Sequence, residues 1–423
     1  MKNNTGIIFE NAGGFMDRYA EFVQFLEKHF IAPENVIYSQ IDKQTFLPVT
    51  EELFKDCPSR EENPELIGHA YACVPGFTRS EFFSYEDTGM STGATITAAA
   101  MEYKRTKNPA ALDRVKRLFS GIKNICARGA ELEEGFITKF YGGKLTMQTS
   151  TDQCLYLMWG MDACYDLLSA DDRAFIEKQI PAIVDFWVRH NYTWSYFEHK
   201  DMVWPPLRFP PMLLMAWHYS GEARFKKEAD RIMAENIAFV PEFDHLTAFP
   251  GRIFSDYELK NNVRSLFNIA ACVIMDVMNL SLMLRYEPDH EFAPIWKKGI
   301  AAIWDQGRRV IKEDGFASSD AFYQPDTGKT VLPYDDYPQP WAAKTSWSTM
   351  IVSGGLLGLS HMPEKREEVL KYADLVLGKL APEDMIYKEE LHNFPQAWCY
   401  QDKTLSGDAI SSYLWSYELL QRA

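Results

Sequence analysis

Residues 151–189 read TDQCLYLMWGMDACYDLLSADDRAFIEKQIPAIVDFWVR, and their pattern indicates the fold class. Its first part, up to Leu168, is apolar almost all round, which is typical of a helix buried on most sides. Ser169, with Asp172 three residues later, is a helix-capping pattern that begins a second helix. Apolar residues line one face of this second helix: Ile176, Ile180, Ile183, Val184 and Trp187. The stretch therefore predicts a hairpin of an inner, buried helix and an outer, half-solvated helix.

The same alternation of an apolar helix and a charged, amphipathic helix recurs along the chain. Inner helices are expected to begin near Met90, Ser150, Arg208, Asn262, Lys344 and Ser406. Outer helices are expected to begin near Phe15, Pro109, Ala170, Glu222, Glu291 and Pro363. The inner starts lie about 54 to 62 residues apart, except for one gap of about 82 residues that contains an inserted loop at about 314–340.

A hairpin that cannot bury its apolar face alone gains stability by stacking on its neighbours. The period therefore predicts an all-α protein, a single (α/α)6 toroid of six helical hairpins over residues 1–423. The helix over about 15–30 closes the ring beside the helix that begins near Ser406. Small residues at 91–100 and 353–360 let inner helices approach closely. An open α-solenoid and a bundle of two separate domains are the alternative architectures.

The composition and net charge of the chain argue against two classes of partner. Apolar residues make up 46% of the 423 residues, enough to bury a large core, while a net charge of −15 repels phosphate backbones and anionic lipids. Neither nucleic acid nor a membrane is expected as a partner. The amino-terminal residues lack the basic start and apolar run of a signal peptide, so a cytoplasmic location is expected. Oligomeric state does not follow from the sequence.

The cysteines do not suggest a metal site. Seven are present, an odd number, and none is spaced as a zinc ligand pair. Buried free thiols are expected, and we predict neither a metal nor another cofactor.

Acidic residues cluster in the connections that lead from outer to inner helices. If all inner helices run in the same direction, these connections meet at one mouth of the ring. The acids predicted to be catalytic are Asp87, Asp152, Asp335 and Asp336. A pair of carboxylates is what glycosidic bond cleavage requires. An aspartate at a helix start also serves as a cap, so capping stays open for each of them.

Amide, aromatic and basic side chains accompany these acids. The residues predicted to bind substrate are Gln153, Trp204, Arg208, Tyr257, Arg264, Tyr337, Trp341 and Trp347. Aromatic rings bind the apolar faces of sugars, and amides bind hydroxyls. Arg208 and Arg264 suit a substrate carboxylate because guanidinium binds such groups with two hydrogen bonds. Either arginine can instead pair with an aspartate at the mouth.

The chain resembles the six-hairpin glycosidase superfamily, and within it the unsaturated glucuronyl and rhamnogalacturonyl hydrolases. The resemblance rests on DTGMSTGATIT at 87–97, YKRTKNP at 103–109 and TSTDQ at 149–153. It implies that Asp152 is the general acid and base and that Asp87 is the second carboxylate. The usual His-rich and paired-Asp signatures of these hydrolases are absent near both positions, and a uronidase or another glycosidase on this toroid fits equally.

Together these features predict a glycoside hydrolase that acts on uronic-acid-containing or related oligosaccharides by carboxylate acid/base chemistry. Three alternatives stay open. A sugar 2-epimerase of the N-acylglucosamine type shares this toroid and works through histidines, for which His199 and His392 are candidates. A polysaccharide lyase uses a tyrosine or histidine base. A toroid that binds glycans without catalysis is the alternative outside enzymes.

Overall fold

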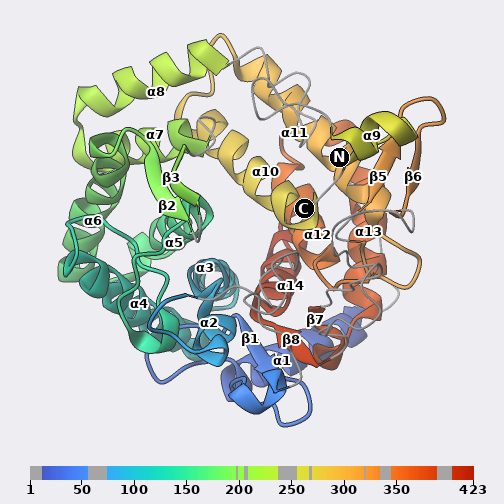
Figure 1. Ribbon diagram of the computed structural model, residues 1–423, viewed down its shortest axis with the longest axis horizontal. Coiled ribbons are helices and arrows are strands. Elements are labelled where there is room, and N and C mark those ends of the chain that lie inside the picture. The colour runs from blue at the N-terminus through green and yellow to red at the C-terminus, as the bar shows by residue number, and fades with distance from the viewer. Residues whose placement is uncertain are drawn as a thin grey trace, which may run out of the picture.

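The computed structural model describes residues 12–55, 74–196, 199–203, 208–236, 255–265, 269–318, 321–333, 344–387 and 403–423. Its helices form a ring of two concentric layers (Figure 1). The inner layer consists of α3 (Thr88–Thr106), α5 (Thr151–Cys164), α7 (Phe209–Ser220), α10 (Ile269–Tyr286), α12 (Ser348–Gly358) and α14 (Gly407–Leu420). The outer layer consists of α1 (Ala12–His29), α4 (Pro109–Ala130), α6 (Ala170–Arg189), α8 (Ala223–Asn236), α11 (Ala293–Gly307) and α13 (Arg366–Lys379). This is the predicted (α/α)6 toroid.

The hairpin of α5 and α6 shows why the chain forms two layers. Most residues of α5 are buried, because no side of this helix is polar enough to face water. In α6 the predicted stripe from Ile176 to Trp187 is buried, whereas Glu177 and Lys178 are exposed. Ser169 caps α6 through the backbone N–H of Asp172, as the sequence predicts.

Two inner helices begin later than predicted. Residues near the expected start at Asn262 instead end a short separate helix, α9 (Asp256–Asn261), which a capping box of Ser255 and Glu258 begins. Asn262 then adopts a left-handed conformation that stops the helix, and α10 begins at Ile269. Likewise, α12 begins at Ser348 because Thr345 first forms an antiparallel bridge to Ala317.

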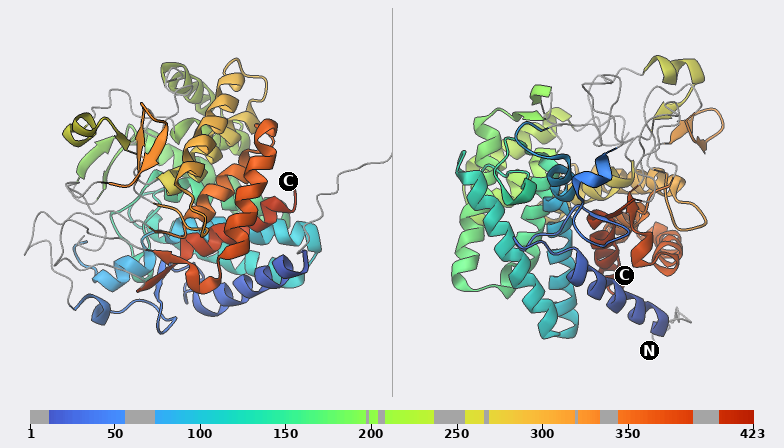
Figure 2. Two further views of the ribbon diagram at one scale, coloured as in Figure 1. Left: turned by 90° about the vertical axis from the view of Figure 1, so that its right-hand side faces the viewer. Right: turned by 60° about the horizontal axis from the view of Figure 1, so that its bottom comes forward.

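The ring closes between α1 and α14, as predicted. The rings of Phe22 and Tyr413 stack with centroids 3.6 Å apart, and those of Tyr19 and Tyr417 stack at 4.2 Å. Figure 2 shows α1 lying alongside the carboxyl-terminal helices. Aromatic stacking therefore joins the first described helix to the last.

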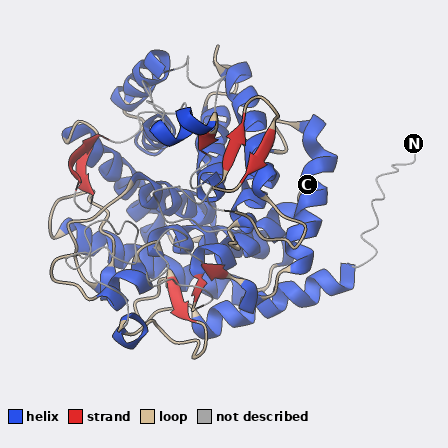
Figure 3. Ribbon diagram, turned by 45° about the vertical axis from the view of Figure 1, so that its right-hand side comes forward, coloured by secondary structure: helices blue, strands red, loops and turns tan. Residues whose placement is uncertain are grey.

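The strands gather at one end of the ring (Figures 2 and 3). Each strand described lies in a connection from an outer to an inner helix: β1 (Gln40–Asp42), β2 (Thr193–Tyr196), β3 (His199–Val203), β4 (Arg264–Ser265), β5 (Phe322–Gln324), β6 (Lys329–Val331), β7 (Ile386–Tyr387) and β8 (Thr404–Ser406). They pair antiparallel in the orders β1-β8-β7, β2-β3 and β4-β5-β6. The hairpin of β5 and β6 lies within the range predicted for the inserted loop.

Shorter helices complete the described structure. They are α2 (Arg79–Tyr85), η1 (Glu51–Phe54), η3 (Tyr141–Gly143), η4 (Tyr165–Leu167), η7 (Arg308–Val310), η8 (Pro363–Lys365) and η9 (Pro382–Asp384). None of the described helices is long and apolar enough to span a lipid bilayer.

Small residues bring the inner helices together, as expected. A Cβ atom at Gly93 of α3 would lie 2.1 Å from the carbonyl oxygen of Tyr156 in α5, so only glycine fits this contact. The four described thiols that are free and buried are Cys126, Cys154, Cys164 and Cys272. The remaining cysteines, Cys57, Cys73 and Cys399, lie outside the described residues.

Candidate active site

The mouth is the end of the ring at which the inner helices begin, and contacts between those starts define it. At the first turns of α5 and α7, Arg208 Nη1 donates to Thr151 Oγ1 at 3.0 Å. At the starts of α12 and α14, Trp347 Nε1 donates to Ser406 Oγ at 3.3 Å. Five residues predicted for the site lie outside the described residues: Trp204, Asp335, Asp336, Tyr337 and Trp341.

Asp87 and Asp152 lie at the starts of the neighbouring helices α3 and α5. Asp87 precedes α3, and its side chain makes no capping hydrogen bond. Asp152 is in the first turn of α5, where its Oδ1 atom is buried and has no hydrogen-bond partner. Neither carboxyl group therefore makes the capping hydrogen bond that the sequence left open. Both are available for other interactions.

Asp408, in the first turn of α14, joins Asp87 at the mouth. The two side chains lie within hydrogen-bonding reach of each other, and Ser91 Oγ of α3 donates to Asp408 Oδ1 at 2.6 Å. Sequence reasoning missed Asp408, although an acid in the first turn of an otherwise apolar inner helix is a visible signal. The pairing itself depends on the closed ring, which places α14 beside α3 (Figure 1).

Burial changes the proton affinity of both carboxyl groups. Loss of hydration raises the pKa of Asp87 to about 7; the cation of Lys139 opposes this rise, and the charges of Glu86 and Asp152 add to it. Burial, followed by the charge of Asp87, raises the pKa of Asp408 well above its usual value. The pair therefore retains at least one proton at neutral pH.

A buried ion pair and an amide hold the segment that carries Asp87. The Lys139 ammonium and the Tyr141 hydroxyl both donate to the Glu86 carboxylate. Gln153 Nε2 donates to the Glu86 carbonyl at 3.0 Å and lies 3.4 Å from Asp87 Oδ1. Gln153 thus links α5 to Asp87, and its predicted contact with substrate stays a prediction.

Another buried acid, Asp276 of α10, lies close enough to Arg208, at the start of α7, to be affected by its charge. Burial raises the pKa of Asp276 to about 7, although the Arg208 guanidinium partly opposes that rise. Asp276 is the one charged side chain in the apolar run that begins α10, so the sequence did carry a signal for it. Arg208 therefore binds the start of α5 and also acts on a carboxyl group that sequence reasoning missed.

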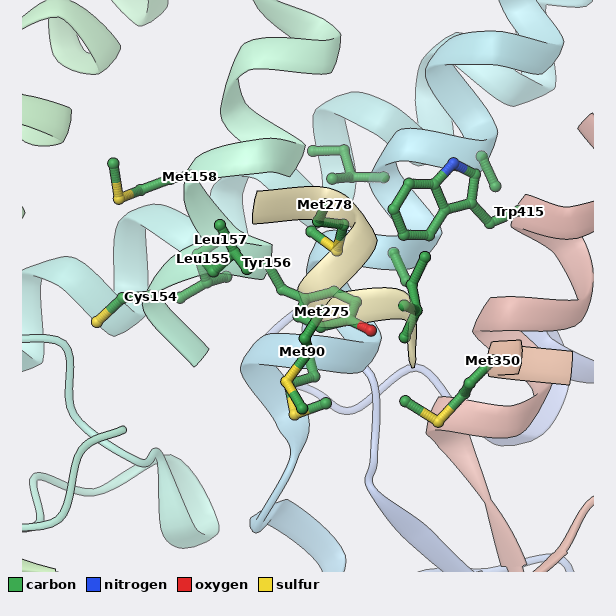
Figure 4. Close-up of a cluster of buried hydrophobic side chains, with 14 of the residues drawn as sticks. Met90, Cys154, Leu155, Tyr156, Leu157, Met158, Met275, Met278, Met350 and Trp415 are labelled. Atoms are coloured by element: carbon green, nitrogen blue, oxygen red, sulfur yellow. The ribbon is translucent and has the colours of Figure 1, made fainter. Parts of the chain in front are cut away.

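Tyr156 extends from α5 into the centre of the ring, among Met90, Met275, Met350 and Trp415 (Figure 4). Its hydroxyl is buried and has no hydrogen-bond partner. Burial raises the pKa of Tyr156 well above its usual value, and the nearby charges of Asp408, Asp152 and Asp87 add to this effect. Tyr156 is therefore a neutral phenol at physiological pH.

Two predicted substrate contacts, Tyr257 and Arg264, belong to the region of α9 and the β4-β5-β6 sheet. Tyr257 packs with Val263 and Phe322 in a small cluster separate from the main core. Arg264 donates from Nη1 to the carbonyl of Val263. Their contact with substrate stays a prediction. That of Trp347 does too, although Trp347 donates to Ser406, two residues before Asp408.

Comparisons with known proteins address the fold. No family model matches the chain, and no curated protein matches its sequence. Solved structures do match over nearly the whole chain. The chain shares their fold, a six-hairpin (α/α) toroid.

Three matches illustrate the range of proteins with this fold. A sugar epimerase from a ruminal bacterium has a TM-score of 0.56 and 11% identity over 97% of this chain and 98% of that one. A family 76 glycoside hydrolase (mannosidase) from Bacteroides thetaiotaomicron has a TM-score of 0.52 and 9% identity over 97% and 99%. An unsaturated glucuronyl hydrolase specific for heparin has a TM-score of 0.51 and 11% identity over 97% and 98%. Identities this low establish a shared fold and leave the reaction open.

Among the residues that the structure describes, the titratable side chains brought together at the mouth include the carboxyl groups of Asp87, Asp152 and Asp408. There, no histidine makes a hydrogen bond or ion pair with Asp87, Asp152 or Asp408; His190, for example, binds Glu133 at 2.8 Å. His199 is described only through its backbone in β3, and His392 lies outside the described residues. Within the same residues no cluster of three or more acidic, histidine or cysteine side chains could hold a metal ion.

Proposed function

We propose that the protein is a glycoside hydrolase that cleaves oligosaccharides at the mouth of the toroid. The observation that carries this proposal is the presence of two carboxyl groups in different environments, Asp87 and Asp152. Asp87 holds a proton near neutral pH, whereas Asp152 presents an oxygen without a partner. Hydrolysis of a glycosidic bond needs one carboxylic acid to protonate the leaving oxygen and one carboxylate to act on the sugar or on water.

In this proposal Asp87 is the acid and Asp152 is the second carboxylate. The family resemblance assigned proton transfer to Asp152, but the raised pKa of Asp87 favours Asp87 as the proton donor. Asp87 gives its proton to the glycosidic oxygen as the bond to the sugar breaks. As that bond breaks, Asp152 either takes a proton from a water that attacks the sugar, or bonds to the sugar itself. In the second case Asp87, now a carboxylate, takes a proton from a water that displaces Asp152 from the sugar and so regains its acid form.

The two rival activities have weaker support at this mouth. A lyase needs a base, and the raised pKa of Tyr156 makes this buried phenol a poor one. An epimerase of the histidine type depends on His199 and His392. The aspartates, by comparison, meet from three inner helices, α3, α5 and α14.

A panel of substrates tests the proposal. The purified protein is incubated with uronic-acid and neutral oligosaccharides, and the release of reducing ends is measured together with absorbance near 235 nm and the anomeric NMR signals of free sugars. We expect reducing ends without new absorbance. New absorbance would indicate a lyase, and interconversion of free sugars an epimerase; either result replaces the hydrolase proposal.

Activity is expected to fall as the pH rises through about 7. The acid form of Asp87 is the active one, and its pKa of about 7 means that this form is lost above that value. The logarithm of kcat/KM should therefore fall with a slope of about −1 on the alkaline side. A profile that stays flat between about pH 6 and 9 would show that Asp87 is not the proton donor.

Arg208 is proposed to bind a carboxylate of the substrate. Arg208→Leu should then weaken the binding of a uronide by about 2 kcal/mol, because a charge-assisted hydrogen bond is lost, and should affect the matching neutral hexoside far less. KM for the two substrates is the measurement. Arg264→Leu, on β4, tests the other predicted arginine in the same way. Equal losses on both substrates would mean that Arg208 only supports the fold, for example through Thr151.

A further inference from the structure

A single residue, Ser39, sets the positions of the helix starts that carry Asp87 and Asp408. The backbone N–H of Asp87 donates to Ser39 Oγ at 2.5 Å, and the backbone N–H of Gly407 donates to the Ser39 carbonyl at 2.7 Å. Pairing of β1 with β8 places Gln40 opposite Ser406, next to both contacts. The beginnings of α3 and α14 are therefore fixed to the same piece of backbone.

Close packing makes this arrangement specific. A Cβ atom at Gly407 would lie 1.9 Å from the carbonyl oxygen of Tyr38, so α14 can begin here only with glycine. The next residue, Asp408, is 5% exposed, whereas Asp87 is only partly buried. Asp408 is thus less accessible to a substrate than Asp87.

A hydrogen bond between the side chains of Asp87 and Asp408 requires a proton on one of the two carboxyl groups. Ser91 Oγ donates to Asp408 Oδ1, and the side chains of Asp408 and Asp87 lie within hydrogen-bonding reach of each other. Two ionised carboxylates this close repel each other and have no hydrogen to share, so a hydrogen bond between them requires that one is protonated. The more deeply buried Asp408 is the better place for a permanent proton, because a buried charge is costly.

We propose that Asp408 is a positioning residue that stays protonated and donates a hydrogen bond to the carboxyl group of Asp87. This inference rests on the proposed hydrolase only for the role of Asp87. When Asp87 transfers its own proton to the glycosidic oxygen, Asp87 becomes a carboxylate and Asp408 keeps its proton. The hydrogen bond from Asp408 strengthens at that moment, because its acceptor gains a charge.

The surroundings of the pair agree with this assignment. The hydrogen bond to Asp408 lowers the pKa of Asp87 and so opposes part of the effect of burial. The other charged or titratable groups that act on the pair are Glu86, Lys139 and Asp152, and Tyr156 lies near all three aspartates. Glu86 and Lys139 neutralise one another as an ion pair, which leaves the negative charge of Asp152 as a further reason for Asp408 to remain neutral.

Two substitutions at Asp408 test whether this residue is a neutral hydrogen-bond donor or a charged neighbour of Asp87. Asp408→Asn keeps a hydrogen-bond donor in nearly the same shape, whereas Asp408→Ala removes it. The pKa of Asp87 is measured in the resting protein by carbon NMR of labelled aspartate side chains, with Asp87→Asn used to assign the signal. We expect Asp408→Asn to leave the pKa of Asp87 near 7 and Asp408→Ala to raise it. A fall in Asp408→Ala would mean that Asp408 is ionised in the native protein, which overturns the proposal.

Infrared spectroscopy gives an independent test that needs only the isosteric variant. At about pH 9 Asp87 and Asp276 are ionised, so the carbonyl band of a protonated carboxyl group should persist in the wild-type protein and disappear in Asp408→Asn. Persistence of that band in Asp408→Asn would contradict the assignment. Asp408→Asn therefore decides the matter even if Asp408→Ala does not fold.

The activity measurements then distinguish this inference from the proposed function. With an active substrate, Asp408→Asn should keep most of kcat, and Asp408→Ala should lower kcat roughly tenfold and move the alkaline limb of the pH profile to higher pH. If no substrate is cleaved, the proposed function fails while the two resting-state measurements still test Asp408. If hydrolysis is found but the limb does not move in Asp408→Ala, Asp408 is only structural and the inference fails alone.

Discussion

Removal of residues 1–31 is expected to abolish cooperative thermal unfolding. The deletion takes away α1, and with it the aromatic rings that cover Tyr413 and Tyr417 of α14. It also removes the hydroxyl of Tyr19, which donates to the buried Glu102 of α3 at 3.0 Å. Apolar surface on two neighbouring helices then meets water, and the ring loses the helix that closes it. Differential scanning calorimetry with circular dichroism is the measurement.

Point substitutions in α1 show whether packing is the cause. Phe22→Ala should lower the free energy of unfolding by about 3 to 5 kcal/mol, because Phe22 is fully buried against Tyr413. Gln24→Ala, on the exposed side of the same helix, is the matched control and should change little. Our proposal that residues 1–423 form one domain depends on this closure. A truncated protein that still melts in one sharp transition would contradict the closed ring.

The architecture could be predicted from the sequence because each hairpin carries its own pattern. The contrast between α5 and α6 is visible in the residues themselves. A helix that is apolar on all sides must be buried, and a helix with one apolar face packs that face against it. The predicted starts of α10 and α12 were too early, because local hydrogen bonds there override the regular spacing of the hairpins. Ser255 and Glu258 form a capping box that the sequence displays, whereas only Tyr257 of this segment is among the predicted site residues, as a substrate contact.

The site was harder to predict because it depends on which helix starts meet. Asp87 and Asp152 stood out as polar residues at the beginnings of apolar helices. Asp408 had the same signal, but its importance comes from Asp87, which reaches it only when the last inner helix lies beside the first. Residue spacing within one hairpin cannot predict this contact, because Asp87 and Asp408 belong to different hairpins. Asp276 could have been noticed as a lone acid in an apolar helix, although only the structure shows Arg208 beside it.

Asp152→Asn and Asp87→Asn are each expected to lower kcat by roughly 10² to 10⁴ with little change in substrate binding. Asparagine keeps the shape of the side chain and removes the proton or the negative charge that the reaction needs. The fold should survive, because neither side chain caps its helix and Asp152 Oδ1 has no partner to lose. Steady-state kinetics with the cleaved oligosaccharide, together with melting temperatures, is the measurement.

Controls decide whether the loss is chemical. Asp171→Asn, in the exposed first turn of the outer helix α6, removes a carboxylate away from the mouth and should keep full activity. The double variant Asp87→Asn/Asp152→Asn should be scarcely worse than either single one, since residues that act as one catalytic unit are not additive. Near-normal turnover with a marked fall in melting temperature in Asp152→Asn would mean that this carboxylate stabilises the start of α5. The catalytic role would then pass to Asp335 or Asp336, which the same substitution tests.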